Sequence, residues 1–139
     1  MTAADHPARY TITTRWEDED VYGHVNNVKY YSYFDTAVNG YLMTATGTDI
    51  RALPAYGIVA ETSCRFLREL RFPQDVVAGL TVTKLGTSSV VYEIALYQGD
   101  DPEPAALGRF VHVYVTAREH AVEPIPAEIR AVLEPLVRP

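Results

Sequence analysis

The sequence predicts an α+β fold in which one antiparallel sheet wraps a single long helix. One long segment, residues 27–42, carries an apolar stripe with helical spacing, and such a face requires a sheet to cover it. Four strand candidates follow this segment in a row, and a fifth precedes it. With so few helices the chain cannot cover both faces of a parallel sheet, so mostly antiparallel strands are expected.

Turn-forming residues separate the expected elements. Residues 10–16 favour a first strand, and Asn26 or Asn27 can cap the helix that follows. Within the helix, the stripe consists of Tyr30, Phe34, Ala37 and Tyr41. The later strands are expected at residues 58–70, 76–85, 89–97 and 106–117, and a short helix at residues 127–133.

The strand at residues 58–70 alternates in a way that assigns its side chains to two faces. One face is expected to carry Ile58, Ala60, Thr62, Cys64 and Phe66, and the other Val59, Glu61, Ser63, Arg65 and Leu67. Both faces of the long strands carry apolar residues, although only one face can meet the helix. We therefore expect the other face to meet a second subunit, in at least a dimer.

Composition limits the classes of protein to which the chain can belong. Its 139 residues fit one domain, 1–139, with a loose lead-in at residues 1–9 and a C-terminal tail at residues 124–139. The net charge of -6 argues against a broad nucleic-acid interface. Cys64 is the only cysteine, which excludes an intrachain disulfide and favours a reducing compartment. With no signal-like or membrane-length apolar run, a cytoplasmic protein is expected.

The segment from Asp18 to Asn27 combines a carboxylate, a tight turn and a helix start. The first amides of a helix have no partner inside it, so they can bind a negative or polarised oxygen. Asp20 can act as a base or nucleophile beside these unpartnered helix amides. Acidic residues and asparagines before a helix are also ordinary capping residues, and the pattern alone does not separate the two interpretations.

The same segment, Asp18-Glu19-Asp20-Val21-Tyr22-Gly23-His24-Val25-Asn26-Asn27 with Tyr30 downstream, resembles the signature of hotdog-fold acyl-CoA thioesterases of the 4-hydroxybenzoyl-CoA thioesterase-like family. The similarity extends over the strand layout to residue 117, including Phe66-Leu67-Arg68-Glu69-Leu70 and Gly86-Thr87-Ser88-Ser89. The turn sequence Gly23-His24-Val25-Asn26-Asn27 is more similar to the general and long-chain acyl-CoA members than to the 4-hydroxybenzoyl enzyme.

The resemblance implies roles for particular residues. Asp20 would be the catalytic carboxylate, the backbone amide of Asn27 would polarise the thioester carbonyl, and Asp18 would be structural. The signature residues Gly23, His24, Asn26 and Tyr30 would contact the substrate. An acyl-CoA or acyl carrier protein thioester is the expected substrate, no bound cofactor is needed, and a homodimer or homotetramer is expected.

Further polar residues are candidates for substrate binding. Glu61 and Ser63 share one face of their strand, where they could reach the substrate or a partner subunit. Basic groups and turn amides suit the phosphates of coenzyme A, although solvated charge at strand ends is the alternative. These anion-binding candidates are Arg65, Lys84, Thr87, Ser88 and Ser89.

Other kinds of site have little support in the sequence. His24 lies near two aspartates, but His6, His112 and His120 have no spacing that indicates a metal cluster. No Gly-x-Ser-x-Gly nucleophile elbow is present. Two alternatives stay open: a non-catalytic hotdog protein that binds acyl-CoA or a small aromatic ligand, and a hotdog hydratase or dehydratase.

Overall fold

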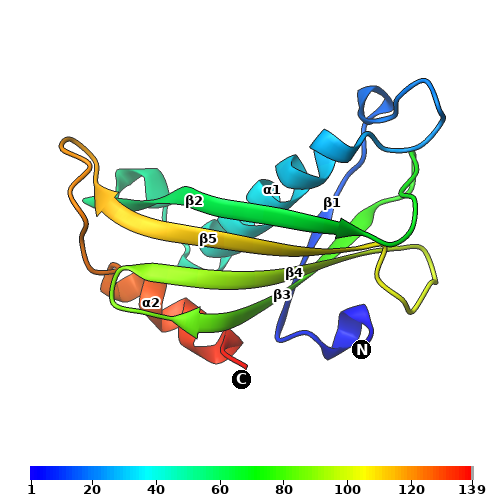
Figure 1. The fold of residues 1–139 in the computed structure, drawn as a ribbon. Coiled ribbons are helices and arrows are strands. Elements are labelled where there is room, and N and C mark those ends of the chain that lie inside the picture. Colours follow the sequence, from blue (N-terminus) through cyan, green and yellow to red (C-terminus); the bar gives the residue numbers. More distant parts are fainter. Residues whose placement is uncertain (139) are drawn as a thin grey trace.

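The computed structural model describes residues 1–138 and confirms the expected α+β architecture (Figure 1). Five strands form one antiparallel sheet in the order β1-β3-β4-β5-β2. The strands are β1 (Ala8–Ile12), β2 (Ala55–Phe66), β3 (Val76–Leu85), β4 (Ser89–Gln98) and β5 (Ala106–Thr116). The helices are α1 (Asn27–Thr46) and α2 (Ala127–Leu133).

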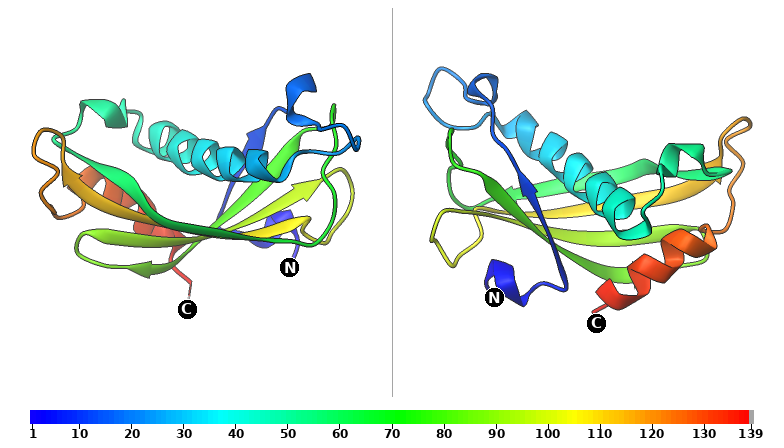
Figure 2. Two further views of the ribbon diagram at one scale, coloured as in Figure 1. Left: turned by 45° about the horizontal axis from the view of Figure 1, so that its top comes forward. Right: turned by 180° about the vertical axis from the view of Figure 1, so that it is seen from behind.

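The sheet curves around α1, which lies along its concave face (Figure 2). Tyr30, Phe34 and Ala37 are buried as the stripe predicts, and Tyr41 is half-buried. Phe34 packs directly over β5 at Gly108, where an added Cβ would lie 2.3 Å from the Phe34 ring. The absence of a side chain at this position therefore lets the central ring of α1 approach the sheet.

The expected faces of β2 are wrong for its first half because a bulge interrupts the strand. Its pairing with β5 shifts between Val59 and Glu61. Val59 pairs with His112 on the face toward α1, whereas Glu61 pairs with Val111 on the opposite face. A bulge inserts one extra residue and so reverses the alternation, which uniform period-two reasoning cannot detect.

The bounds of several elements match the sequence-based expectation. Strand β3 and helix α2 begin and end at the predicted residues, and β4 and β5 differ from the prediction by one residue. Strand β2 begins three residues before the predicted position and ends four before it, and α1 continues to Thr46. Helix α1 ends at Gly47, whose φ of 66° gives the left-handed C-cap that glycine adopts readily.

Helix α2 packs against the C-terminal half of α1 rather than forming a separate tail. The Tyr41 hydroxyl donates a hydrogen bond to the Val132 carbonyl at 2.6 Å, and Ile129 and Leu133 are fully buried. In the described chain, neither helix is long and apolar enough to span a membrane.

Candidate active site

The turn before α1 is closed by its own backbone. The Asp20 amide donates to the His24 carbonyl at 3.1 Å, and the Gly23 amide donates to the Asp20 carbonyl at 3.1 Å. Gly23 adopts φ 81°, in the left-handed region that other residues seldom occupy. The turn therefore brings the chain back so that Asp20 and the start of α1 lie close together.

Asn26 is the N-cap of α1. Its side-chain oxygen accepts a hydrogen bond from the Val28 amide at 3.1 Å, and its carbonyl accepts one from the Lys29 amide at 2.9 Å. Asn27 is the first residue of the helix, and its amide donates to no other group in residues 1–138. This free N–H is one of the unpartnered donors at the positive end of the helix dipole.

A groove of about 350 Å³ lies at this end of the helix, and both Asp20 and Asn27 line it. Asp20 is half-buried, and its Oδ1 accepts a hydrogen bond from the Tyr22 amide at 2.9 Å. The groove is completed by His24, Val25, Tyr30 and the four residues Phe66, Leu67, Arg68 and Glu69. An acidic residue and the first residue of the helix, whose amide is unpartnered, thus line one shared space.

The far wall of the groove comes from the segment after β2, which sequence reasoning did not assign to the site. The rings of Tyr30 and Phe66 meet edge to face, with centroids 4.9 Å apart. The Leu70 amide donates to the Tyr30 hydroxyl at 3.3 Å, and the Val25 amide donates to the Leu70 carbonyl at 2.8 Å. The sequence signal that could have identified this wall is the segment Phe66-Leu67-Arg68-Glu69-Leu70, which forms part of the family resemblance.

Asp18 is fully buried and anchors the start of the turn through its side-chain contacts. Its Oδ2 accepts from the Tyr33 hydroxyl at 2.7 Å and from the Arg15 amide at 2.9 Å. The Lys29 ammonium lies 4.0 Å from Oδ1. Burial and the bond to Asp18 raise the pKa of Tyr33, so the phenol stays protonated and donates to the carboxylate. These contacts agree with a structural role for Asp18.

Charged side chains around the groove are largely paired with one another. Glu69 accepts from Arg71 at 2.7 Å and lies 3.7 Å from His24 Nε2. Arg71 also donates to the Gly23 carbonyl at 2.7 Å, which ties the turn to the segment after β2. Arg68 pairs with Asp101 at 3.2 Å. The two walls of the groove are therefore linked by ionic as well as apolar contacts.

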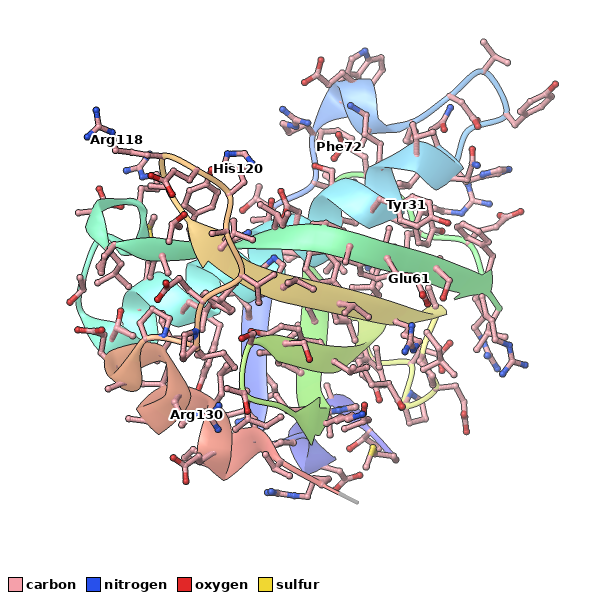
Figure 3. All side chains as sticks on the ribbon, turned by 60° about the vertical axis from the view of Figure 1, so that its left-hand side comes forward. Tyr31, Glu61, Phe72, Arg118, His120 and Arg130 are labelled. Carbon is pink, nitrogen blue, oxygen red and sulfur yellow. The ribbon has the colours of Figure 1, made fainter. Side chains whose placement is uncertain are left out.

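The other predicted binding residues do not reach this groove within one chain. Glu61 (Figure 3), Ser63 and Arg65 lie on the sheet face away from α1, and Glu61 forms an ion pair with Arg109. The β3–β4 turn lies at the opposite end of the sheet, since Ser89 pairs with Val113 and Val113 with Ile58 near the start of β2. This turn carries Thr87, Ser88 and Ser89, with Lys84 near the end of β3.

The remaining nucleophile and metal candidates find no support in the geometry. Cys64 is half-buried on β2, and burial raises the pKa of its thiol to about 11, which keeps it protonated at neutral pH. Among residues 1–138, no group of three or more His, Cys, Asp and Glu side chains could hold a metal ion.

The fold is the hotdog fold, and comparisons with known proteins identify the family. The family model for the thioesterase superfamily matches residues 22–105. Comparison with curated proteins gives no significant match.

Solved structures extend the similarity over nearly the whole chain. The PA5185 protein from Pseudomonas aeruginosa strain PAO1 is 45% identical, with a TM-score of 0.93 over 98% of this chain and 95% of that chain. A thioesterase complexed with coenzyme A and Zn from Thermus thermophilus is 27% identical, with a TM-score of 0.75 over 94% of each chain. BH1999 gentisyl-coenzyme A thioesterase, 24% identical, shares the fold, with a TM-score of 0.78 over 91% of this chain and 99% of that chain.

The chain belongs to the thioesterase superfamily. It is a thioester hydrolase with the hotdog fold.

Proposed function

We propose that this protein is an acyl-CoA thioesterase that hydrolyses an acyl thioester to a free carboxylic acid and coenzyme A, with Asp20 and the Asn27 amide as its reacting groups. The observation that carries the proposal is the single groove that Asp20 shares with the unpartnered amide of Asn27. Coenzyme A as the carrier is supported by the similar Thermus thermophilus thioesterase, which was solved in complex with this molecule.

The Asn27 amide would donate a hydrogen bond to the thioester carbonyl oxygen. As the carbonyl carbon is attacked, negative charge grows on that oxygen, and a preorganised donor at a helix N-terminus stabilises it. Since the amide belongs to the backbone and its position is fixed by the Asn26 cap, little reorganisation accompanies the reaction.

Asp20 can act by two routes with the same products. As general base, it takes a proton from water while the water oxygen bonds to the carbonyl carbon, the C–S bond breaks, and the leaving thiolate takes up a proton. As nucleophile, its carboxylate displaces the thiolate to give a mixed anhydride, which water then hydrolyses. A thiol with a pKa of about 8.5 leaves readily, so neither route requires a strong general acid.

The site is proposed to be completed by a second copy of the chain, through pairing of two β2 strands. Strand β2 is an edge of the sheet and exposes Ile58, Val59 and Phe66, and the next residue, Leu67, is also exposed. Such an edge offers unpaired backbone groups together with apolar side chains. In an antiparallel pair, the Ala55 end of one β2 would lie beside the Phe66 end of the other.

This arrangement gives the remaining predicted residues a place in the site. The β3–β4 turn, with Thr87, Ser88 and Ser89, lies at the same end of the sheet as Ala55. In the proposed dimer this end of the partner would approach the groove, so the turn amides and Lys84 could meet coenzyme A phosphates. Arg65 on β2 would lie nearby, whereas Glu61 and Ser63 would contact the partner strand.

Thiol release from a panel of acyl-CoA esters, followed with a thiol reagent, tests the proposed activity. We expect turnover by the wild-type protein and its loss in Asp20→Asn, with folding retained. Turnover of acyl carrier protein thioesters alone would contradict the coenzyme A assignment, and no turnover of any thioester would favour a binding protein.

The absence of an intrachain disulfide is consistent with a cytoplasmic enzyme.

A mass measurement by light scattering tests the assembly. We expect a dimer or tetramer for the wild type, and dissociation when charge is placed on the β2 edge in Val59→Lys. A wild-type monomer that hydrolyses thioesters at full rate would contradict the shared site.

A further inference from the structure

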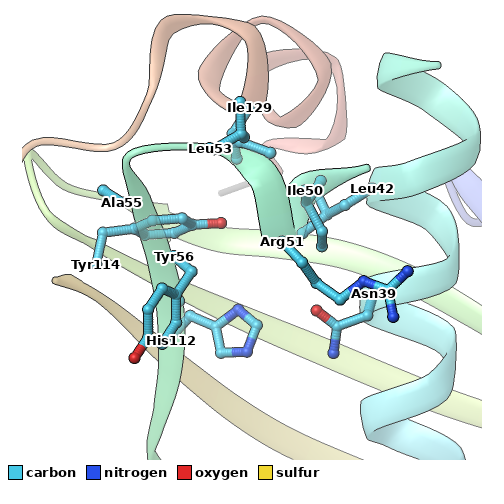
Figure 4. A pocket seen from close by; sticks show the side chains of 11 residues that line it. Asn39, Leu42, Ile50, Arg51, Leu53, Ala55, Tyr56, His112, Tyr114 and Ile129 are labelled. Carbon is cyan, nitrogen blue, oxygen red and sulfur yellow. The ribbon is translucent and has the colours of Figure 1, made fainter. Parts of the chain in front are cut away.

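A second cavity, of about 310 Å³, lies near the other end of α1 (Figure 4). Asn39 and Leu42 of α1 form one wall, and the others come from residues 50–53, the start of β2, strand β5 and Ile129 of α2. No residue lines both this cavity and the Asp20 groove. Twelve residues of helix separate Asn27 from Asn39, which corresponds to about 18 Å at the rise of an α-helix.

The cavity is mostly apolar but has polar groups at fixed positions. Its apolar walls consist of Leu42, Ile50, Leu53, Ala55 and Ile129. Its buried polar side chains are His112 and Tyr114 on β5, and Asn39 lies across from the His112 ring (Figure 4). A pocket of this size, with few polar groups in apolar walls, is typical of small-molecule binding sites.

His112 is the unusual member of this set. Its side chain is 2% exposed, its Nδ1 has no hydrogen-bond partner, and its ring is surrounded by Phe110, Tyr92 and Tyr114. An unpartnered buried polar group destabilises the folded state, and an apolar side chain would avoid that penalty. The fold nevertheless makes room for the ring, because a Cβ at Gly57 would lie 2.8 Å from His112 Nδ1.

The buried polar side chains of the cavity, His112 and Tyr114, are uncharged. Burial lowers the pKa of His112 to about 4, and burial raises the pKa of Tyr114, so both are neutral at physiological pH. Arg51, the one cation among the lining residues, is paired with Asp49 at 2.9 Å. A carboxylate or phosphate would therefore be buried without a free countercharge.

We propose that this cavity is a binding site for a small neutral alcohol or phenol, whose hydroxyl group hydrogen-bonds to His112 and Tyr114. A neutral imidazole offers one donor and one acceptor, and a phenol offers both, so a ligand hydroxyl can donate to one residue and accept from the other. The remainder of the ligand is apolar and contacts Leu42, Ile50 and Ile129. This site is independent of the thioester chemistry proposed for the Asp20 groove.

Three compounds of similar shape test the proposal on the wild-type protein. Phenol, toluene and benzoate are titrated while the methyl NMR signals of Leu42, Ile50 and Ile129 are followed. We expect saturable shifts with phenol and at least fivefold weaker binding of toluene and of benzoate. Equal affinity for phenol and toluene, tighter binding of benzoate, or no saturable shift with phenol at about 10 mM would overturn the proposal.

Two variants assign the hydroxyl contact. His112→Leu should reduce phenol affinity about fivefold or more, to the level of toluene, whereas Asp20→Asn in the distant groove should leave phenol affinity unchanged. If His112→Leu does not fold, Gly57→Ala displaces the ring by steric contact and should also weaken phenol binding. Phenol affinity that is unchanged in a folded His112→Leu protein would contradict the assigned contact.

Discussion

The two ends of α1 meet different chemical environments. At its N-terminus, Asn27, whose amide is unpartnered, lines a groove together with Asp20 and several ionic side chains. Near its C-terminus, the helix borders an apolar cavity with uncharged polar groups. The helix contributes to this difference, because unpartnered amides and the positive dipole end occur only at its start, whereas side chains from several segments line the cavity. One helix thereby separates a place suited to developing negative charge from a place suited to neutral ligands.

The largest expected effect is at Asp20. We expect Asp20→Asn to lower kcat for acyl-CoA hydrolysis several hundredfold, because the base or nucleophile is lost while the turn hydrogen bond to Tyr22 can be kept. Steady-state thiol release measures this effect, and circular dichroism checks the fold. The control is Asp100→Asn in the exposed β4–β5 loop, which should keep wild-type kcat. Equal turnover in the two variants would remove Asp20 from the reaction.

The next largest effect distinguishes the role of the Asn27 backbone amide from that of the Asn27 side chain. Asn27→Pro deletes the amide at the first helical position, where proline is well tolerated, and Asn26 already has the extended ψ of 140° that precedes proline readily. We expect kcat to fall about a hundredfold, as for loss of one oxyanion donor. Asn27→Ala retains the amide and should stay within a few fold of wild type. Similar rates for the two variants would exclude the amide from catalysis.

At the other end of α1, we expect low pH to destabilise the folded protein through protonation of His112. The unfolded histidine has a pKa near 6.5 and the folded one about 4, so this contribution to stability is complete above pH 6.5 and is lost as pH falls toward 4. We expect the free energy of unfolding of the wild type to fall by about 2 kcal/mol more than that of His112→Leu between pH 7 and pH 4.5. Urea unfolding at both pH values measures this, and equal losses would contradict a buried neutral His112.

The smallest effect compares two glycines that flank α1. Gly23 and Gly47 both have positive φ, and an added Cβ at either position would meet no atom within 4 Å. Alanine at either position should therefore cost about 1 kcal/mol of stability through backbone strain alone. Only Gly23→Ala should also lower kcat, because Gly23 shapes the turn that carries Asp20. A matching loss of activity in Gly47→Ala would show that catalysis responds to helix stability in general.

Local sequence signals predicted the elements better than the surfaces that they form. Turn residues and prolines bound β3 and α2 correctly, and the aromatic stripe of α1 identified the core. The faces of β2 could not be predicted, because the bulge after Val59 depends on pairing with β5. The His112 cavity was also missed, since its walls come from distant segments and a lone histidine in an alternating strand has no distinguishing pattern.

In the candidate site, too, residues close in sequence could be predicted, whereas residues brought in from a distant segment could not. Asp20, Asn26 and Asn27 are close in sequence, so capping chemistry and the family resemblance could bring them together. The far wall of the groove, from Phe66 to Glu69, is some forty residues away and was not assigned a role. Hydrogen bonds such as that from the Leu70 amide to Tyr30 bring it into place, and these depend on the folded sheet.

A structure of the protein with a non-hydrolysable acyl-CoA analogue, in which a methylene group replaces the thioester sulfur, gives the most direct test. We expect the analogue carbonyl oxygen within hydrogen-bond distance of the Asn27 nitrogen, about 2.7–3.2 Å, with an Asp20 oxygen next to the carbonyl carbon or to a water beside it. A carbonyl group bound away from α1's first amide, with Asp20 turned toward solvent, would contradict it.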